Sequence, residues 1–594
     1  MINDRNPHAE YKTLLQTRRS EVDRLTRLHI RIGNLRLVVA TVFLFLAWHG
    51  FIRKSISPLW PLVPVLIFVV LVVFHDRVIR RMKRATRGVA FYERGLARLE
   101  HRWMGTGESG VRFRESNHPA ADDLDLFGEA SLFQLVSAAR TRIGEQTLAH
   151  WLLWPTAPAT VRERQGSVEE LRDRLQLRED LAVLGEDLRS GVHPQALTQW
   201  AAEQAGLLSK PARIAALILP ILLLVSLATW PEGGALSLTL LALEAILGLI
   251  YRRRVRHLVE GVDQAARDLA LLVGVLHLFE QQRFQSPGLS RLRSQLELDG
   301  VTASHQIARL SRLVELLDSR RNLFMQVIGP PLLYTTQLAF AVEAWRRDSG
   351  PLVKEWLSAI GEMEALSSLA GYAFEHPRDP FPELVENVTY FEGIGLGHPL
   401  LPEERCVRND VRLDEETRVL VVSGSNMSGK STLLRTVGIN TVLAMAGAPV
   451  RARHLVLCGF QVGASIRVTD SLQAGDSRFY AEIKRLRLLV DLTREAFILL
   501  FLLDELLHGT NSHDRRIGGE GIVRGLIGRG AVGLVTTHDL ALARIVEQLG
   551  PQARNVHFQD HMEEGKISFD YKLYPGIVEK SNALELMRSI GLEV

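Results

Sequence analysis

The sequence predicts a multi-domain protein in which an α-helical core carries two transmembrane helical hairpins and a C-terminal α/β domain follows. Three observations favour this organisation. Four apolar runs occur as two pairs, long amphipathic helices follow the second pair, and a strand, a Gly-rich loop and a helix succeed one another over 419–432. A chain of 594 residues with 46% hydrophobic residues leaves room for several cores.

Overall composition excludes two broad classes of protein. A net charge of only +4 is not that of a general polyanion binder. The two cysteines, Cys406 and Cys458, cannot form a disulfide framework and fit a reducing cytosol. The polar, charged N-terminus is not followed by a small-residue cleavage site, so no secretory signal is expected.

The first apolar pair is predicted to form a transmembrane hairpin over 37–75. Residues 1–36 precede it as a basic cytoplasmic helix with arginines at helical spacing. Apolar runs cover 37–52 and 59–74, slightly short of a full span, and flanking residues can extend them. Trp48 and Trp60 lie at the inner edges of the hairpin, where an interfacial belt would place them.

The second pair, at 214–251, is predicted to form another hairpin closed by a tight turn. Pro220 and Glu244 interrupt it, and Glu244 is expected to face another helix or a polar cavity. Arginine and lysine clusters flank the outer ends of both pairs, so the positive-inside rule predicts an inner- or plasma-membrane protein with cytoplasmic domains. The alternative is two buried core hairpins in a soluble protein.

The remaining helical parts are predicted to form a cytoplasmic core. Its first part covers 76–213 and includes a charged helix over 161–184. Its second part covers 252–380, with helices over 262–285, 310–328 and 332–370, the last interrupted near Gly350–Pro351. Helices of this length suggest lever-like arms, although an ordinary helical bundle is equally compatible with the pattern.

The last part, 381–594, contains a phosphate-binding loop. Val419–Val422 is an apolar strand, and Gly424-x-x-x-x-Gly429-Lys430-Ser431 follows it before a helix. Glycines without a Cβ let the backbone wrap phosphate oxygens, and loop N–H groups point at the anion. Lys430 is predicted to reach the β- and γ-phosphates of ATP and to act in catalysis, and Ser431 to ligate Mg²⁺. The predicted nucleotide-binding residues of the loop are Gly424, Ser425, Asn426, Met427, Ser428, Gly429, Lys430, Ser431 and Thr432.

Further polar residues follow later strands of the same domain. Asp504 and Glu505 end the apolar strand 498–503, so Asp504 is predicted to hold Mg²⁺ through water and Glu505 to polarise the attacking water. His538 ends strand 534–537 and is predicted to contact the γ-phosphate or that water, although alone it would more often be structural. Ser477 precedes a helix, where it either caps the helix or presents its hydroxyl to a phosphate.

Together these motifs resemble the ATPase domain of the MutS mismatch-repair family, an ABC-like P-loop NTPase. The resemblance rests on Asn426-Met427 inside the loop and on the motifs at 447–452, 477–482, 504–510, 537–538 and 555–557. The resemblance covers roughly 120–200 and 350–594. Outside the ATPase motifs it is to the MutS core-lever domain, whose start resembles 132–171 and whose end resembles 356–370 and 397–400. The resemblance of the ATPase domain implies a homodimer in which two such domains face one another. It also implies that Ser477 reaches the γ-phosphate bound to the partner chain and that His557 packs on the adenine.

The chain also departs from this family. The mismatch-reading and connector domains of MutS have no counterpart among the first ~120 residues, which the predicted hairpin and linkers occupy. We therefore expect a membrane-anchored MutS-like ATPase, related to mismatch repair by family, whose ATP-driven dimer closure controls binding of double-stranded DNA without mismatch specificity. The alternatives are a membrane scaffold and a transporter-like ATPase.

Overall fold

The computed structural model describes residues 6–578 except 116, 189–191, 204–209, 229–233, 321, 426, 468–477, 508–511, 539–542, 544 and 564–565. The described chain divides into two compact units. Unit 1 combines 1–137, 151–183 and 369–594, and unit 2 combines 138–150 and 184–368.

The C-terminal part of unit 1 is an α/β domain with two sheets. Its larger sheet has six strands in the order β12-β11-β6-β10-β9-β8, all parallel except β12. The smaller sheet has the order β3-β7-β4-β5. The strands are β3 (Glu383–Leu384), β4 (Phe391–Leu396), β5 (Asn409–Leu413), β6 (Val419–Ser423), β7 (His454–Leu457), β8 (Phe460–Ser465), β9 (Ile498–Leu503), β10 (Val532–Thr537), β11 (Ala553–Glu563) and β12 (Lys566–Pro575).

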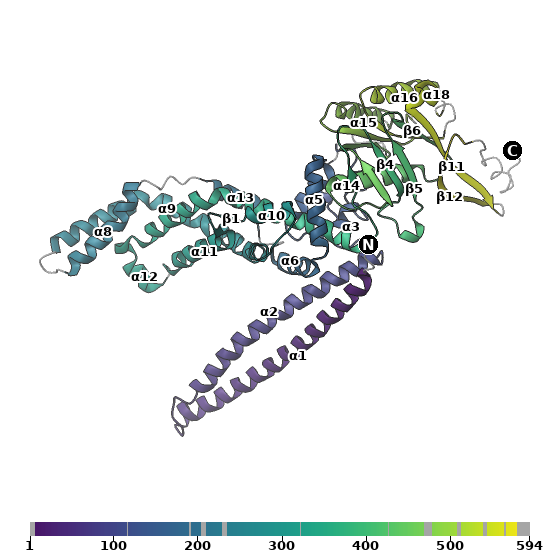
Figure 1. Ribbon diagram of the computed structural model, residues 1–594. Helices are drawn as coiled ribbons and strands as arrows, with labels where there is room; N and C mark the ends of the chain where they lie inside the picture. The colour runs from purple at the N-terminus through teal and green to yellow at the C-terminus, as the bar shows by residue number, and fades with distance from the viewer. Residues whose placement is uncertain are drawn as a thin grey trace. The chain divides into compact units, whose positions relative to one another are not determined.

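Helix α14 (Lys430–Ala446) lies between the two sheets (Figure 1). It packs on β8, β9 and β10 of the larger sheet and on β4 of the smaller one, so nearly all of its residues are buried. The other short elements of this domain are η4 (Glu403–Arg405), α15 (Arg478–Leu492), α16 (Ser512–Ile527), α18 (Ile545–Leu549) and η5 (Gly550–Gln552).

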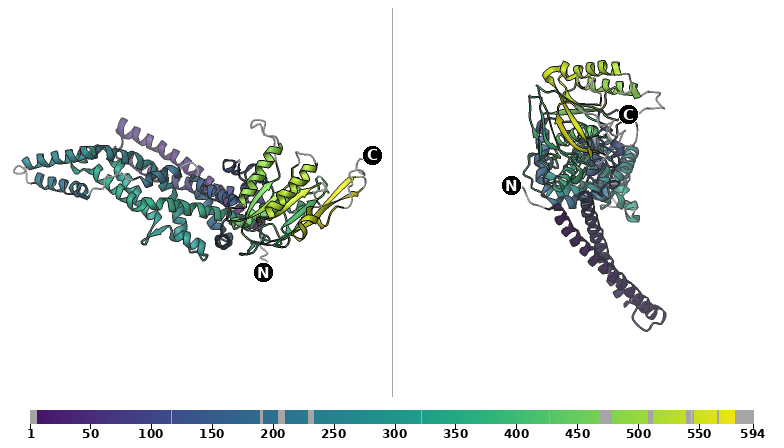
Figure 2. Two further views of the ribbon diagram at one scale, coloured as in Figure 1. Left: turned by 90° about the horizontal axis from the view of Figure 1, so that it is seen from above. Right: turned by 90° about the vertical axis from the view of Figure 1, so that its right-hand side faces the viewer.

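The N-terminal part of unit 1 is a long helical hairpin of α1 (Pro7–Ala47) and α2 (Leu62–Leu99), which run side by side (Figures 1 and 2). A π-helical turn, η1 (Trp48–Ile52), follows α1 directly. The predicted basic helix and the first half of hairpin 37–75 are thus one continuous helix. The apolar halves of α1 and α2 expose their side chains, whereas the polar halves are partly buried.

Two buried carboxylates fasten the base of this hairpin to the rest of unit 1. Glu375 accepts hydrogen bonds from the Tyr11 hydroxyl at 3.1 Å and from Arg98 Nε at 2.7 Å. Glu179 accepts from Arg18 Nε at 2.6 Å and from the Tyr92 hydroxyl at 2.7 Å. These bonds join the hairpin to the ends of helices that lie more than 80 residues away in the sequence.

The short helices that follow the hairpin differ from prediction at one place. The expected helix 161–184 is two helices, α5 (Pro158–Arg172) and α6 (Leu175–Leu188), because α5 ends at Asp173. The other elements between the hairpin and α5 are η2 (Val111–Phe113) and α3 (Leu132–Val136) in unit 1, and α4 (Arg142–Leu153), most of which belongs to unit 2.

Unit 2 is a helical bundle in which α9 (Gly234–Glu280) packs on α8 (Lys210–Ala228) and α11 (Ala303–Ser319) (Figure 2). The 47 residues of α9 run without a break from the second apolar pair into the predicted helix 262–285. The other elements are α7 (Pro194–Ala202), α10 (Pro287–Ser294), β1 (Glu297–Leu298), β2 (Val301–Thr302), α12 (Leu323–Ile328), η3 (Pro330–Leu332) and α13 (Tyr334–Glu375).

Two glycines explain features of this bundle. The predicted interruption near Gly350–Pro351 is wrong, since α13 continues through Pro351. A Cβ at Gly350 would lie 2.4 Å from the Ala201 carbonyl oxygen, so the glycine permits close packing there. A Cβ at Gly144 would likewise collide with the buried Glu364 carboxylate, which accepts the backbone N–H of Thr141 at 3.1 Å.

Four helices of the described chain are long and apolar enough to cross a membrane. They lie within Pro7–Ile52, Leu62–Leu99, Pro211–Ala228 and Gly234–Glu280, the four segments that the sequence pairs as hairpins. In the most apolar window of each helix, at most 28% of residues are buried within the protein. Apolar surface on this scale requires a partner other than water.

Candidate nucleotide site

The strand order brings the three predicted motifs to one edge of the larger sheet. Strand β10 pairs in parallel with β6 on one side and with β9 on the other, with Thr537 opposite Ser423 and Val535 opposite Leu503. Each motif follows the carboxyl end of its strand, and such ends meet at the ligand-binding edge of a parallel sheet. The phosphate-binding loop, Asp504 and His538 therefore gather at this edge.

The loop adopts backbone conformations that suit glycine. Gly424 has φ +154° and Gly429 has φ +102°. A Cβ on Gly424 would lie 2.8 Å from Ser428 Oγ, so the loop closes tightly around a position that only glycine fills without displacement. Met427 also has a positive φ, +71°, and its side chain is 86% exposed.

Lys430 begins α14 and turns its ammonium group into the loop. Its Nζ donates to the carbonyl oxygens of Gly424 and Ser425, both at 2.8 Å. Burial lowers the pKa of Lys430, while the nearby carboxylates of Glu505 and Asp504 oppose this shift. A cation held in the mouth of a loop of backbone N–H groups is suited to an anionic ligand.

Asp504 is the centre of a small hydrogen-bond network. Ser431 Oγ donates to its Oδ2 at 2.6 Å, and the hydroxyl of Thr536 donates to its Oδ1. The same Thr536 oxygen accepts the backbone N–H of Glu505 at 3.1 Å. Thr536 is fully buried, so it fixes both acidic residues relative to strand β10. Thr536 is not among the residues predicted from the sequence, although its position in β10, two residues before His538, is a usable signal.

Glu505 and His538 form a second contact at this edge. His538 Nδ1 lies 3.2 Å from Glu505 Oε1, and both side chains are partly exposed. Glu505 has φ +45°, a left-handed conformation that is uncommon for a residue with a side chain. Such backbone strain at a cluster of polar groups is typical of a functional site.

A cavity of about 460 Å³ lies beside the loop. Its wall includes Gly429 and Thr432 from the loop and helix, and Phe558 and Tyr571 from β11 and β12. The predicted base contact, His557, is next to Phe558 in β11, and successive strand residues face opposite sides. The buried ring of His557 bonds instead with the Gly576 carbonyl at 3.2 Å. Phe558 and Tyr571 are thus the aromatic residues that line the cavity, and neither is among the residues predicted from the sequence.

The structure therefore gathers most of the predicted site. Lys430, Ser431, Asp504, Glu505 and His538 meet at one edge of the sheet. Ser425, Ser428 and Thr432 belong to the same loop and the first turn of α14. Asn426 and Ser477 lie outside the described residues.

The residues present fit a nucleotide with its divalent cation. The loop closes too tightly to admit a Cβ at Gly424, as a backbone that wraps phosphate oxygens requires, and Lys430 supplies a buried positive charge. Ser431 and Asp504 are oxygen donors of the kind Mg²⁺ takes from proteins, which usually give it one or two ligands beside phosphate oxygens. No cluster of three or more His, Cys, Asp or Glu side chains suited to a metal occurs among the described residues, in keeping with this sparse donor set.

Comparison with known proteins assigns the domain that carries this site. Residues 420–593 match the family model of MutS domain V. The domain that carries the nucleotide site is therefore similar to MutS domain V. The chain is 31% identical over 261 residues to endonuclease MutS2 of Thermus thermophilus, a match covering 42% of this chain and 32% of that protein.

Two mismatch-repair proteins give similar results. The chain is 32% identical over 251 residues to MutS of Thermotoga neapolitana, covering 41% of this chain and 30% of the relative. It is 26% identical over 313 residues to MutS of Lactobacillus helveticus, covering 50% and 35%. The chain thus spans about a third of the length of these curated relatives. The family model covers the C-terminal domain, and the apolar helices of units 1 and 2 lie outside it.

Proposed function

We propose that this chain is a membrane-anchored ATPase of the MutS type. The observation that carries the proposal is the network that joins Ser431, Asp504, Thr536, Glu505 and His538 at the mouth of the phosphate-binding loop. Bound ATP with Mg²⁺ would supply the phosphoryl bond to be hydrolysed and the charge that balances the phosphates. The protein residues supply position, charge and a proton acceptor.

Each residue has a distinct part in this proposal. Lys430 leaves its two loop carbonyls to bind phosphate oxygens, and Ser431 and Asp504 would hold the metal ion. Glu505 orients a water molecule and accepts its proton, and His538 holds the Glu505 carboxylate in place. Phe558 and Tyr571 provide aromatic surface for the base in the adjoining cavity. Thr536 is a positioning residue, because it acts through Asp504 and Glu505.

We further propose that the site works in a homodimer. Met427 supports this, because an apolar side chain that is 86% exposed at the mouth of a nucleotide site is suited to being covered by another protein surface. Closure of two ATPase domains around ATP, and their release after hydrolysis, would move the helices joined to domain V. The expected contribution of Ser477 to the partner's site belongs to this proposal.

The membrane part of the proposal rests on the two apolar hairpins. Leu37, Leu44 and Leu66 are each more than 65% exposed, on helices whose polar ends are fastened to unit 1 through Glu375 and Glu179. Burying such side chains in lipid is favourable by about 25 cal/mol per Å² of apolar surface. The chain is expected to stay in the membrane pellet after alkaline carbonate extraction and to enter solution only with detergent. Release by carbonate alone would contradict the anchoring.

The nucleotide site is tested with purified full-length protein in detergent. Lys430→Ala is expected to abolish nucleotide binding, and Glu505→Ala to bind ATP, turn it over at less than about 1% of the wild-type rate and accumulate as an ATP-bound dimer. Glu416→Ala, which removes an exposed carboxylate of the same domain, is the matched control. Unchanged turnover in Glu505→Ala would remove the site assignment.

For the ligand that the ATPase cycle controls, we propose double-stranded DNA, as the names of the relatives suggest. Binding should require ATP-loaded protein and weaken steeply as salt rises, because phosphate contacts release counterions. A protein that shows no DNA affinity at low salt would instead favour a membrane scaffold or a transporter-like ATPase. Stable capture of one cytosolic protein without nucleic acid would identify the scaffold.

A further inference from the structure

Glu244 lies in the middle of the apolar half of α9. Its side chain is only 2% exposed, and neither carboxylate oxygen has a hydrogen-bond partner within the described part of the chain. Leaving a carboxyl group buried and unpaired costs several kcal/mol. A group this costly in an apolar helix is a candidate for a functional site.

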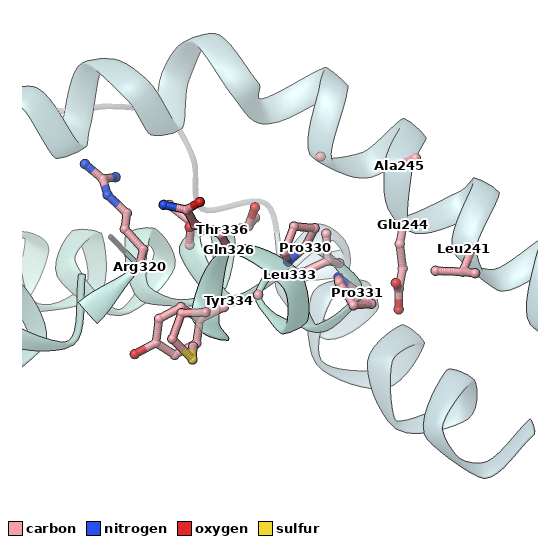
Figure 3. A pocket seen from close by; sticks show the side chains of 14 residues that line it. Leu241, Glu244, Ala245, Arg320, Gln326, Pro330, Pro331, Leu333, Tyr334 and Thr336 are labelled. Carbon is pink, nitrogen blue, oxygen red and sulfur yellow. The ribbon is translucent and has the colours of Figure 1, made fainter. Parts of the chain in front are cut away.

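Glu244 faces a cavity of about 490 Å³ between α9 and the turn that joins α12 to α13 (Figure 3). Helix α9 contributes Leu241 and Glu244 to its wall, and the turn contributes Pro330, Pro331 and Leu333. In the close-up the Glu244 carboxylate extends from its helix towards this Pro-rich turn. The volume falls within the range of small-molecule sites, which are mostly apolar with a few fixed polar groups.

Arg320 also lines the cavity, but it lies at the opposite end from Glu244 in the close-up (Figure 3) and donates no hydrogen bond to the Glu244 carboxylate. Polar side chains that contact α8 bond to other groups. Pro220 has no N–H for the Ala216 carbonyl one helical turn earlier, and Gln337 Nε2 donates to that oxygen at 3.1 Å. The same Gln337 nitrogen also donates to Leu332 at 2.8 Å, which uses its second proton. Ser226 and Ser237, buried between α8 and α9, bond to each other at 2.8 Å.

We propose that this cavity binds the ammonium group of an amphiphilic amine, with the carboxylate of Glu244 as its counter-ion. A carboxylate without other donors requires a cation, and the apolar wall requires that the cation carry an apolar body. Tyr334 also lines the cavity. Its hydroxyl donates to the Leu316 carbonyl at 3.0 Å, and Leu316 is not part of the cavity wall, so the aromatic ring is the part of Tyr334 that is offered to a ligand. Aromatic rings favour organic cations over hydrated metal ions.

The route of entry is from the lipid, and this step rests on the proposed membrane placement. Glu244 is eight residues before the basic cluster that begins at Arg252, or about 12 Å along a helix at 1.5 Å per residue. The α12–α13 turn shares the cavity with Glu244, so it lies at the same depth. The apolar residues Leu323, Phe324 and Val327 of α12 are 82%, 71% and 73% exposed, which is suited to lipid and not to water.

The test measures binding of dodecylamine to purified full-length protein in a non-ionic detergent at neutral pH. Wild-type protein should bind it saturably, and Glu244→Gln, which keeps the shape of the side chain, should lower the affinity at least tenfold. Glu260→Gln removes an exposed carboxylate from the polar half of α9 and should bind as wild type does. Dodecanol, which lacks the charge, should not distinguish wild type from Glu244→Gln.

Two further arms separate the source of the amine. Nanodiscs containing phosphatidylethanolamine should compete with dodecylamine if a lipid headgroup is the ligand, and phosphatidylcholine nanodiscs should compete much less. Competition by neither, with Glu244-dependent binding retained, assigns the cavity to a free amphiphilic amine. Equal dodecylamine binding by wild type and Glu244→Gln would overturn the proposal. This outcome is distinct from failure of the ATPase or of membrane anchoring, because neither turnover nor a bilayer enters the detergent measurement.

Discussion

Replacing Thr536 by valine isolates the residue that connects the two acidic groups of the nucleotide site. The substitution keeps the β-branched shape and removes only the hydroxyl, which donates to Asp504 and accepts the N–H of Glu505 at 3.1 Å. Because Thr536 is fully buried, water does not replace the lost bonds.

The expected cost follows from those two bonds. A hydrogen bond to a charged acceptor contributes about 1.5–3 kcal/mol and a neutral one about 1 kcal/mol, so the domain should lose roughly 2.5–4 kcal/mol. If the misplaced Asp504 carboxylate makes the free energy of Mg²⁺ binding less favourable by about 1.4 kcal/mol, the affinity for Mg²⁺ falls tenfold. We therefore expect the Mg²⁺ concentration for half-maximal ATP turnover to rise about tenfold, with kcat reduced by a similar factor as Glu505 loses its anchor.

The assay is ATP turnover across a Mg²⁺ titration with the full-length protein in detergent. Thr536→Ser restores the hydroxyl and should recover most of both parameters. Thr441→Val is the matched control, since Thr441 is equally buried but its hydroxyl bonds only the Val437 carbonyl within α14. Thr536→Val protein that keeps the Mg²⁺ dependence and turnover within twofold of wild type would refute the positioning role.

Three other perturbations test separate parts of the structure. Glu375→Ala leaves Arg98 buried without its partner, which should cost about 3–5 kcal/mol locally and speed amide exchange at the base of the α1–α2 hairpin. Unchanged protection of these amides would argue against a stabilising role of Glu375 at the hairpin base. Gly424→Ala should weaken nucleotide binding at least tenfold with the circular dichroism spectrum preserved, because its Cβ would lie 2.8 Å from Ser428 Oγ. Burial lowers the pKa of His118 from 6.5 to about 4. The stability that the neutral ring contributes should therefore be full above pH 6.5 and be lost as pH falls towards 4, by about 2 kcal/mol at pH 5. His118→Gln should flatten this part of the pH profile of Tm, and an unaltered profile would contradict the role of His118.

The nucleotide site was largely predictable because its chemistry is written in short motifs. An apolar strand followed by Gly424 and Lys430, and another followed by Asp504, each specify a local structure with few alternatives. A short motif does not show on which side of the sheet a strand residue lies when the pairing register of that strand is unknown. The sequence predicts that His557 packs on the base, whereas Phe558 is the β11 residue that lines the cavity beside the loop, and His557 lies opposite Ser423 of β6.

The helical parts show the same division. Apolar periodicity identified the hairpins, but it could not show that α9 continues for 47 residues or that α13 passes through Pro351. Those outcomes depend on packing partners, such as the Ala201 carbonyl that approaches Gly350. Tertiary contacts override a local helix-breaking signal when they supply the space and bonds that the local sequence lacks.

The sequence by itself determined the MutS-type nucleotide motifs and the four apolar segments, because both are properties of consecutive residues. Only the tertiary structure decided that Thr536 joins Asp504 to Glu505 and that Phe558 and Tyr571 adjoin the loop. It also decided that Glu244 faces a cavity and has no hydrogen-bond partner among the described residues. Each of these depends on residues far apart in the chain. Their distances are set by strand order and helix packing, which no local pattern encodes.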